Sequence, residues 1–377
     1  MKKFILIFVP FILAGCSQSN VLPKHQSENV FQVGGDLSFL PEIEFNGGKY
    51  YDGDQEKDAI TLLKDHGFNS VRVKIWHTPE KNFNTLERVA AMAKRIYAAE
   101  MTFMLDFHYS DWWADPGKQI KPKAWNDLSF DVLKDSMYTY TRNVLTTLKN
   151  QNTLPHIVQI GNEIRPGLLW PEGRIGGEYE TPEQWDQLVA LLEAGKKGIV
   201  DAVGSDSLID IMIHYDNGGD NNGCRHFYDN LQKRNFEFDL IGLSFYPKWH
   251  GTLDSLKSNL ADLTKRYDKD VIVVETAYPW SLNWTERGGL DNDNNIFGME
   301  SDIHSGYPPT IEGQTEFFKA LIHIIRTVPG GRGIGVYYWE PEWISVEGLG
   351  SHWENAALFD FEGRVLPSID AFTGREK

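Results

Sequence analysis

Cysteine is almost absent from this chain of 377 residues, which contains only Cys16 and Cys224. A disulfide framework or a structural zinc site needs several cysteines at short, defined spacings. Cys224 has no second cysteine nearby, and His226 beside it does not complete a zinc-binding spacing. We therefore expect a fold that depends on its apolar core and has no intramolecular disulfide.

Positive charge is also scarce. Lys and Arg number 37 against 53 Asp and Glu, which gives a formal net charge of -16. Nucleic acids and anionic membrane surfaces bind clusters of Lys and Arg on one face of a protein. The sequence therefore disfavours nucleic acid as a partner and favours a neutral or cationic one.

The N-terminal apolar run, "FILIFVPFILA" after Lys2 and Lys3, is shorter than the ~20 residues that span a bilayer. Such a run is typical of a signal-peptide core. The "LAGC" that follows resembles the lipobox of bacterial lipoproteins, which implies cleavage before Cys16 and acylation of that residue. We expect a signal peptide over residues 1–15, then the lipidated Cys16 and a flexible tether over residues 16–30. An ordinary signal peptide with a chance cysteine is the alternative.

The same resemblance implies a location. A lipid on Cys16 would hold the protein at the bacterial outer membrane or cell surface, and Ser17 permits delivery to the outer membrane. Whether the protein faces the periplasm or the exterior stays open. The membrane contact is expected to come from the lipid anchor and not from charge.

Eight short apolar or β-branched runs follow the tether, separated by longer helical or loop stretches. They are "QVGGDLSFL", "SVRVKIW", "TFMLDFH", "HIVQIGNE", "LIDIMIHYD", "LIGLSFYP", "VIVVETAYP" and "GIGVYYWEP". A helix signal between two of them is "LERVAAMAKRIYAAE", with Val89, Met92, Ala93 and Ile96 on one face. Alternating strands and helices favour a parallel sheet that is covered by helices.

Eight such units predict an α/β fold, a (β/α)8 TIM barrel that forms one catalytic domain over residues 31–377. A doubly wound sheet is the alternative, but the sequence shows no glycine-rich phosphate turn. In a barrel the site lies at the carboxyl ends of the strands, and polar or aromatic residues do end most of the eight runs. They include Arg72, His108, Asn162, Glu163, Tyr246, Glu275 and Trp339.

Glu163 and Glu275 end the fourth and seventh runs. Two carboxylates that face each other across a pocket are the minimum for glycoside hydrolysis. Arg72 and the Tyr246 hydroxyl near Glu275 would favour its charged form, which suits a nucleophile. Glu163 has no cation beside it in its strand, which suits an acid/base with a raised pKa. For either glutamate alone, a loop or capping carboxylate would be the ordinary explanation.

Asn162 and Glu163 are adjacent, so both can face one pocket only if the strand ends or bulges there.

A specific family resemblance runs from about Gly35 to Gly363. The segments "LDFHYSDWWADPGKQIKPKAW", "IVQIGNEIRPGLLWP", "LSFYPKWHGTL", "VIVVETAYPW" and "YYWEPEWI" resemble glycoside hydrolase family 53 of clan A, the arabinogalactan endo-β-1,4-galactanases. The resemblance implies Glu163 as acid/base, Glu275 as nucleophile and retention of configuration. It also implies that Asn162 binds the sugar 2-hydroxyl, that Arg72, His108 and Tyr246 line the cleavage subsite, and that Trp339 forms its floor.

Tryptophan is abundant, with twelve residues. Several, such as Trp185, are expected to pack inside the fold. Others lie in segments that follow strand ends, where an indole can stack on the apolar face of a sugar. These are Trp112, Trp113, Trp125, Trp249, Trp280 and Trp343.

The segment "LDNDNNIFGMESD" places Asp291, Asp293 and Asn295 at alternate positions. Several oxygen ligands at such spacing suit calcium, although the segment is not an EF-hand and a solvated acidic turn is the simpler explanation. Bacterial members of the resembled family have a calcium ion between the loops after strands seven and eight. "GLGSHWEN" resembles the second loop and adds Ser351 and Glu354. The ion would be structural, and no organic cofactor is expected.

The sequence thus predicts a lipid-anchored, monomeric glycosidase that cleaves β-1,4-linked galactan inside the chain with retention of configuration. One alternative is another clan A endo-glycanase that acts on mannan or glucan, because these enzymes share the barrel and the two glutamates, and only their loops determine which sugar is bound. The other alternative is a surface lipoprotein that binds glycan without catalysis.

Overall fold

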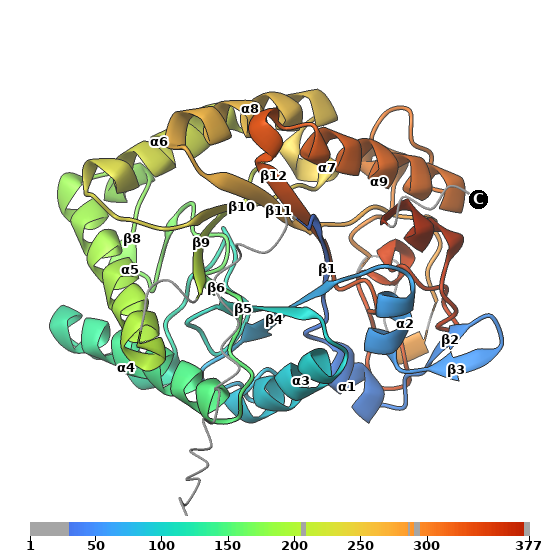
Figure 1. Cartoon of the computed structure of the whole chain (residues 1–377), viewed down its shortest axis with the longest axis horizontal. Coiled ribbons are helices and arrows are strands. Elements are labelled where there is room, and N and C mark those ends of the chain that lie inside the picture. Colours follow the sequence, from blue (N-terminus) through green and yellow to red (C-terminus); the bar gives the residue numbers. More distant parts are fainter. Residues whose placement is uncertain (1–29, 205–208, 286, 290–294, 373–377) are drawn as a thin grey trace, which may run out of the picture.

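The computed structural model describes residues 30–204, 209–285, 287–289 and 295–372. Eight parallel strands close a barrel in the order β1, β12, β11, β10, β9, β6, β5, β4 (Figure 1). The strands are β1 Gln32–Asp36, β4 Ser70–Ile75, β5 Thr102–Phe107, β6 Ile157–Ile160, β9 Asp210–Tyr215, β10 Leu240–Ser244, β11 Asp270–Thr276 and β12 Gly333–Trp339. Each coincides with one of the eight predicted runs, β11 beginning one residue earlier than its run, so the predicted (β/α)8 barrel is confirmed.

Helices surround the barrel in Figure 1. They are α1 Leu40–Phe45, α2 Ala59–Asp65, α3 Leu86–Ala98, α4 Phe130–Asn150, α5 Pro182–Val203, α6 Asn221–Lys233, α7 Pro247–His250, α8 Leu253–Tyr267 and α9 Ile311–Arg326. The predicted apolar face of α3 is the one that is buried. Helix α5 begins at Pro182, whose fixed backbone suits a first turn, and the Thr181 side chain accepts a hydrogen bond from the Gln184 N–H.

Two hairpins and several short 3-10 helices lie in the segments outside the barrel strands. The hairpins pair β2 Tyr50–Asp52 with β3 Gln55–Lys57, and β7 Gly167–Leu168 with β8 Gly173–Arg174. The 3-10 helices are η1 Lys123–Trp125, η2 Gly177–Tyr179, η3 Arg287–Gly289, η5 Glu300–Asp302, η6 Pro329–Gly331, η7 Glu354–Ala356 and η8 Pro367–Phe372. The β7–β8 hairpin lies in the loop that follows β6, and so belongs to the face where the strands end.

An apolar cluster fills part of the barrel interior. It consists of Met104, Ile157, Met212, Leu240, Ile272, Val274 and Tyr337. Tyr337 fits because Gly34 on the neighbouring strand has no side chain, and a Cβ there would lie 2.2 Å from the tyrosine ring. A larger apolar core lies between the strands and the helices.

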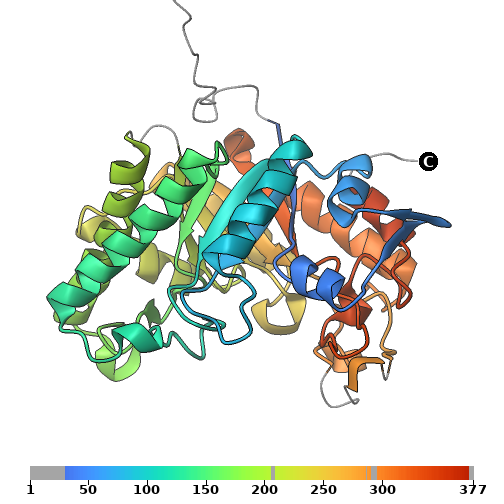
Figure 2. The same ribbon diagram turned by 90° about the horizontal axis from the view of Figure 1, so that it is seen from below.

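The loops after the strands gather at one end of the barrel, at the lower edge of Figure 2, where the loops after β11 and β12 reach furthest. Within the described residues, no helix is long and apolar enough to cross a membrane. Cys224 is fully buried, and the Asn259 side-chain amide donates to its sulfur at 3.3 Å.

Candidate active site

Arg72 on β4 lies at the centre of a charged layer inside the barrel. Its guanidinium contacts the carboxylates of Asp36, Asp106 and Glu275 at 2.8 Å each. It also donates to the side-chain oxygen of Asn162 at 2.8 Å. Arg72 is only 1% exposed. Arg72 is therefore a buried residue that orients the other side chains of this layer.

Glu275, near the end of β11, is held by two donors. Arg72 Nη1 lies 2.8 Å from Oε1, and the Tyr246 hydroxyl donates to Oε2 at 3.1 Å. Burial raises the pKa of Glu275 to about 7, and the positive charge of Arg72 opposes that rise. A carboxylate with a guanidinium on one oxygen and a phenol on the other is fixed in orientation and favoured in its charged form.

The chain leaves strand geometry directly after β6. Gly161 has φ 83° and Glu163 has φ 51°. The left-handed region costs a residue with a side chain about 1–2 kcal/mol, and such strain is concentrated at functional sites. The turn sends the Asn162 side chain to Arg72 and the Glu163 side chain to Ser244, which donates to Oε1 at 2.6 Å. Asn162 and Glu163, neighbours in sequence, thus face one site because the strand ends before them.

Glu163 is partly exposed, yet protein atoms surround its carboxyl closely. Desolvation raises its pKa well above the ordinary range, and the negative charges of Glu275 and Asp216 add to that rise. Arg165 lies in the same loop, but its guanidinium contacts Asp216 at 3.0 Å. Since a cation opposes the rise for Glu275 but not for Glu163, a single proton shared by the two belongs on Glu163.

The two glutamates come together from β6 and β11, which β9 and β10 separate in the barrel. One carboxylate oxygen of Glu163 and one of Glu275 lie within 4.8 Å of each other. Retaining glycosidases keep their carboxyl groups about 5–5.5 Å apart, whereas inverting enzymes leave about 6.5–9.5 Å for a water molecule. The separation therefore suits direct attack by one carboxylate on the sugar.

The other predicted substrate residues lie around this pair. Tyr246 contacts Glu275 directly and the partly exposed Trp339 lies among other indoles, with ring centroids 5.6 Å from Trp113 and 4.7 Å from Trp353. His108 is 3% exposed, and both ring nitrogens have protein partners: Nε2 lies 3.0 Å from Asp106 and Nδ1 accepts from the Ala114 N–H at 3.0 Å. His108 therefore belongs, like Arg72, to the buried charged layer.

Two indoles are exposed beside the site. Trp112 is 47% exposed with its ring centroid 4.8 Å from Trp76, and Trp249 is 48% exposed with its centroid 5.6 Å from Tyr246. Because these large apolar rings stay in solvent, both remain available for stacking on a sugar.

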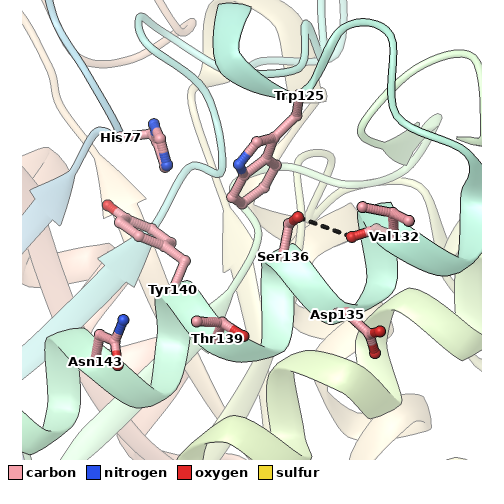
Figure 3. A pocket seen from close by; sticks show the side chains of 8 residues that line it. All are labelled: His77, Trp125, Val132, Asp135, Ser136, Thr139, Tyr140 and Asn143. Carbon is pink, nitrogen blue, oxygen red and sulfur yellow. Dashed lines mark hydrogen bonds between the residues drawn. The ribbon is translucent and has the colours of Figure 1, made fainter.

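The expectation that Trp125 and Trp343 offer indole faces to a sugar is wrong. Trp125 is 5% exposed and packs against His77 and Tyr140, beside a hollow of about 360 Å³ on the outer side of α4 (Figure 3). Trp343 is 7% exposed and stacks on Phe39 at 3.9 Å. Trp185, expected to be internal, is 3% exposed. Position after a strand end does not distinguish a ring that lines a cleft from one that supports a loop.

The residues expected to bind calcium are only partly described. Asp291 and Asp293 lie outside the described residues. Both carboxylate oxygens of Glu354 accept from Thr285, from its N–H and from its hydroxyl. The Ser351 hydroxyl donates to the Trp343 carbonyl at 2.7 Å, while the buried side-chain nitrogen of Asn295 has no hydrogen-bond partner within the described part of the chain.

Sequence reasoning missed several residues of the charged layer. Ser244 donates to Glu163, Gln159 donates to Asp106 at 2.6 Å, and Lys74 contacts Glu340 at 2.7 Å. Ser244 is two residues before Tyr246 and Gln159 is near the end of its strand, so alternation along the strands could have placed both inside the barrel.

Comparison with known proteins identifies the family. Residues 32–372 match the family model of Glycosyl hydrolase family 53. The chain is 48% identical over 351 residues to an uncharacterized protein from the region 5′ of bgaB in Niallia circulans, covering 91% of this chain and 94% of that protein. It is 34% identical to an arabinogalactan endo-beta-1,4-galactanase of Cellvibrio japonicus, over 98% of this chain and 96% of that enzyme.

A solved structure agrees. The Ignisphaera aggregans GH53 catalytic domain superposes with a TM-score of 0.84 at 38% identity, covering 94% of this chain and 99% of that one. With the model match and the two relatives, this likeness extends over nearly all of the described barrel. The chain therefore belongs to glycosyl hydrolase family 53.

Proposed function

We propose that this protein is an endo-acting β-1,4-galactanase that hydrolyses galactan or arabinogalactan with retention of configuration. The observation that carries the proposal is the pair Glu163 and Glu275, whose oxygens lie within 4.8 Å of each other at the carboxyl ends of β6 and β11. The family supports a glycoside hydrolase, and the galactanase relative from Cellvibrio japonicus supports the sugar. An acidic surface with exposed indoles suits a neutral polymer.

In the first step Glu163 gives its proton to the glycosidic oxygen while Glu275 attacks the anomeric carbon. The bond to the leaving sugar breaks and an ester to Glu275 forms. In the second step Glu163, now ionised, takes a proton from water, and the resulting hydroxide displaces Glu275 from the sugar. Two displacements at one carbon restore the starting configuration.

The neighbouring side chains support these roles. Arg72 and Tyr246 favour the charged form of Glu275 and fix the orientation of its carboxylate. The Asn162 side-chain oxygen accepts from Arg72, and its side-chain nitrogen donates to the Ala114 carbonyl at 2.9 Å. An amide nitrogen carries two hydrogens, so one stays available for the sugar 2-hydroxyl, a contact that tightens toward the transition state. Trp339 forms the floor, and Trp112 and Trp249 extend the binding surface.

Reducing-end release from a panel of purified polysaccharides tests the substrate. We expect rapid release of oligosaccharides from β-1,4-galactan, with a fall in chain length early in the reaction, and little or none from mannan, xylan or β-glucan. Activity on one of the others without activity on galactan would instead identify a different clan A endo-glycanase. Binding to galactan without hydrolysis would identify a glycan-binding protein.

A lipid on Cys16 is a further part of the proposal, and it rests on the "LAGC" segment. The described chain begins at Val30, just before the amino end of β1, whereas the glutamates lie at the carboxyl ends of the strands. A tether attached there would leave the cleft facing away from the membrane, open to polymer. Incorporation of labelled fatty acid into the wild type but not into Cys16→Ser tests the anchor.

The protein is proposed to act as a monomer.

Calcium between the loops after β11 and β12 is proposed as a structural ion. Protein contacts already join these loops: the Ile296 N–H donates to the His352 carbonyl at 3.0 Å, and the Asn355 side chain donates to the Phe297 carbonyl at 2.7 Å. Glu354 keeps lone pairs beyond those used by Thr285, and the Asn295 side chain has an oxygen to offer. Together with Asp291 and Asp293 these residues supply the oxygen ligands that calcium prefers.

A further inference from the structure

Ser244, the last residue of β10, is fully buried and lies directly behind the carboxyl group of Glu163. Its hydroxyl donates to Glu163 Oε1 at 2.6 Å. Among the described residues, no hydrogen bond to the other oxygen, Oε2, is found. The two oxygens of this carboxyl group are therefore in different environments before any substrate binds.

His214 on β9 continues this contact away from the cleft. Its Nε2 lies 2.9 Å from the Ser244 oxygen. Its Nδ1 faces the backbone N–H of Glu163 at 3.3 Å and the side-chain nitrogen of Gln159 at 3.1 Å. A backbone N–H can only donate, so Nδ1 must be the acceptor and the ring hydrogen must be on Nε2.

The direction of the chain of hydrogen bonds follows. Burial and the charge of Arg72 lower the pKa of His214 well below its ordinary value, so the ring is neutral and carries one hydrogen. Nε2–H donates to the Ser244 oxygen, and the serine hydrogen is left to point at Glu163 Oε1. The Asn162 oxygen also lies 3.1 Å from Nδ1, but Nδ1 accepts from the Glu163 N–H and so has no hydrogen to donate to that oxygen.

We propose that Ser244 is a positioning residue for the acid/base. Its hydroxyl donates a hydrogen bond to Oε1 of Glu163, so that Oε2 is the oxygen that gives the proton to the glycosidic oxygen. This inference rests on the proposed function. The proton leaves Oε2 for the leaving sugar as the glycosidic bond breaks, and it returns to Oε2 from water when the ester to Glu275 is hydrolysed. The serine donates to Oε1 throughout and itself loses no proton.

Ser244 also stabilises the ionised form of Glu163, because a donor to a carboxylate favours its charge. The charged and titratable groups that face Glu163 are Glu275, Asp216 and Asp115, with Arg165 bound to Asp216 and His214 behind Ser244. Removing the hydroxyl leaves these groups in place. The pKa of Glu163 should then rise further, and the alkaline limb of kcat/KM should move to higher pH.

Ser244→Ala and Ser244→Thr, compared with the wild type on galactan across pH, test this inference. We expect Ser244→Ala to lose about tenfold to a hundredfold in kcat/KM, the range for one hydrogen bond to a charged group, and to move the alkaline limb upward. The loss should shrink for an aryl galactobioside with a good leaving group, whose departure needs little protonation. Ser244→Thr, which keeps the hydroxyl, should restore the position of the limb.

An unchanged alkaline limb in Ser244→Ala would overturn the inference, as would an equal loss for good and poor leaving groups. Should threonine prove too large, shown by a lowered unfolding temperature, the alanine variant alone decides. The activities of the wild type and of Glu163→Gln distinguish a failure of this inference from a failure of the proposed function. An active wild type with an inactive Glu163→Gln and an unmoved Ser244→Ala limb would remove only the role of Ser244. An inactive wild type would remove the proposed function itself.

Discussion

The carboxylate oxygens of Glu163 and Glu275 approach within 4.8 Å, yet among the described residues a guanidinium contacts Glu275 alone of the two, that of Arg72 at 2.8 Å. This difference between two otherwise similar groups divides the chemistry between them. As pH rises past about 7 the Glu275 carboxyl loses its proton, while the Glu163 carboxyl keeps its proton. The predictions below depend on that division.

Glu163→Gln and Glu275→Gln should each stop galactan hydrolysis, but for different reasons. Loss of the general acid is expected to cost on the order of 10²- to 10⁴-fold on galactan and much less in the first step with a dinitrophenyl leaving group. Loss of the nucleophile should remove turnover of both substrates. Initial rates with the two substrates, and galactan binding by calorimetry, measure the difference.

Glu347→Gln, at an exposed position in the loop after β12, is the matched control and should keep the wild-type rate. If Glu163→Gln or Glu275→Gln also kept most of that rate, the assigned roles would be wrong.

Tyr246→Phe should move the acid limb of kcat/KM upward. Activity needs Glu275 ionised and Glu163 protonated, so the rate rises as pH passes the pKa of Glu275, about 7, and falls beyond that of Glu163. The wild-type maximum should therefore lie above pH 7. Tyr246 donates to Glu275 at 3.1 Å, and losing that donor raises the pKa of the nucleophile. A pH–rate profile in which only the alkaline limb moved would contradict this role for Tyr246.

Glu342→Gln should stabilise the protein at alkaline pH. Glu342 is fully buried, neither of its oxygens has a hydrogen-bond partner among the described residues, and burial with the charge of Glu340 raises its pKa well above 4.5. The unfolded chain ionises above that ordinary value while the folded chain stays neutral, so folding stability falls as pH rises from about 4.5 toward the folded pKa. Within this window the fall is about 1.4 kcal/mol per pH unit.

Thermal unfolding at pH 4 and pH 8 measures the effect. The wild type and Glu342→Gln should unfold at similar temperatures at pH 4, with the variant higher at pH 8, whereas the exposed Glu347→Gln should follow the wild type at both. A pH dependence that survives unchanged in Glu342→Gln would show that other groups cause it.

Calcium should raise the unfolding temperature, and EDTA should lower it, because an ion that binds only the folded chain stabilises it. The carboxylate ligands should matter most, so Glu354→Gln should weaken the response to calcium. Because Glu354 also accepts from Thr285, the variant should be compared with Thr285→Val, which removes the hydroxyl donor but no calcium ligand. If neither calcium nor EDTA changed the unfolding temperature, a structural calcium ion would be ruled out.

The barrel and the two glutamates could be predicted because their signals are local. Each strand is a short apolar run, and the parallel topology brings the carboxyl ends of all runs to one face. Glu163 and Glu275 end their runs, so the topology alone placed them near each other. The same reasoning placed Tyr246 beside Glu275.

The support beneath the glutamates could not be predicted in the same way. The bonds from Ser244 to Glu163 and from His214 to Ser244 depend on the register between three strands that are far apart in sequence. Burial of Trp125 and Trp343 depends on the conformation of the long loops over the barrel, which no periodic pattern in the sequence predicts. The β7–β8 hairpin contains too few residues to leave a strand pattern.

The anomeric form of the first product distinguishes double displacement through Glu275 from single displacement by water. Proton NMR during the first minutes of β-1,4-galactan hydrolysis separates the β anomer from the α anomer before mutarotation mixes them. Double displacement predicts that new reducing ends appear first as the β anomer, because Glu275 attacks and is then displaced at the same carbon. New reducing ends that appear first as the α anomer would contradict it, since they would mean a single displacement by water.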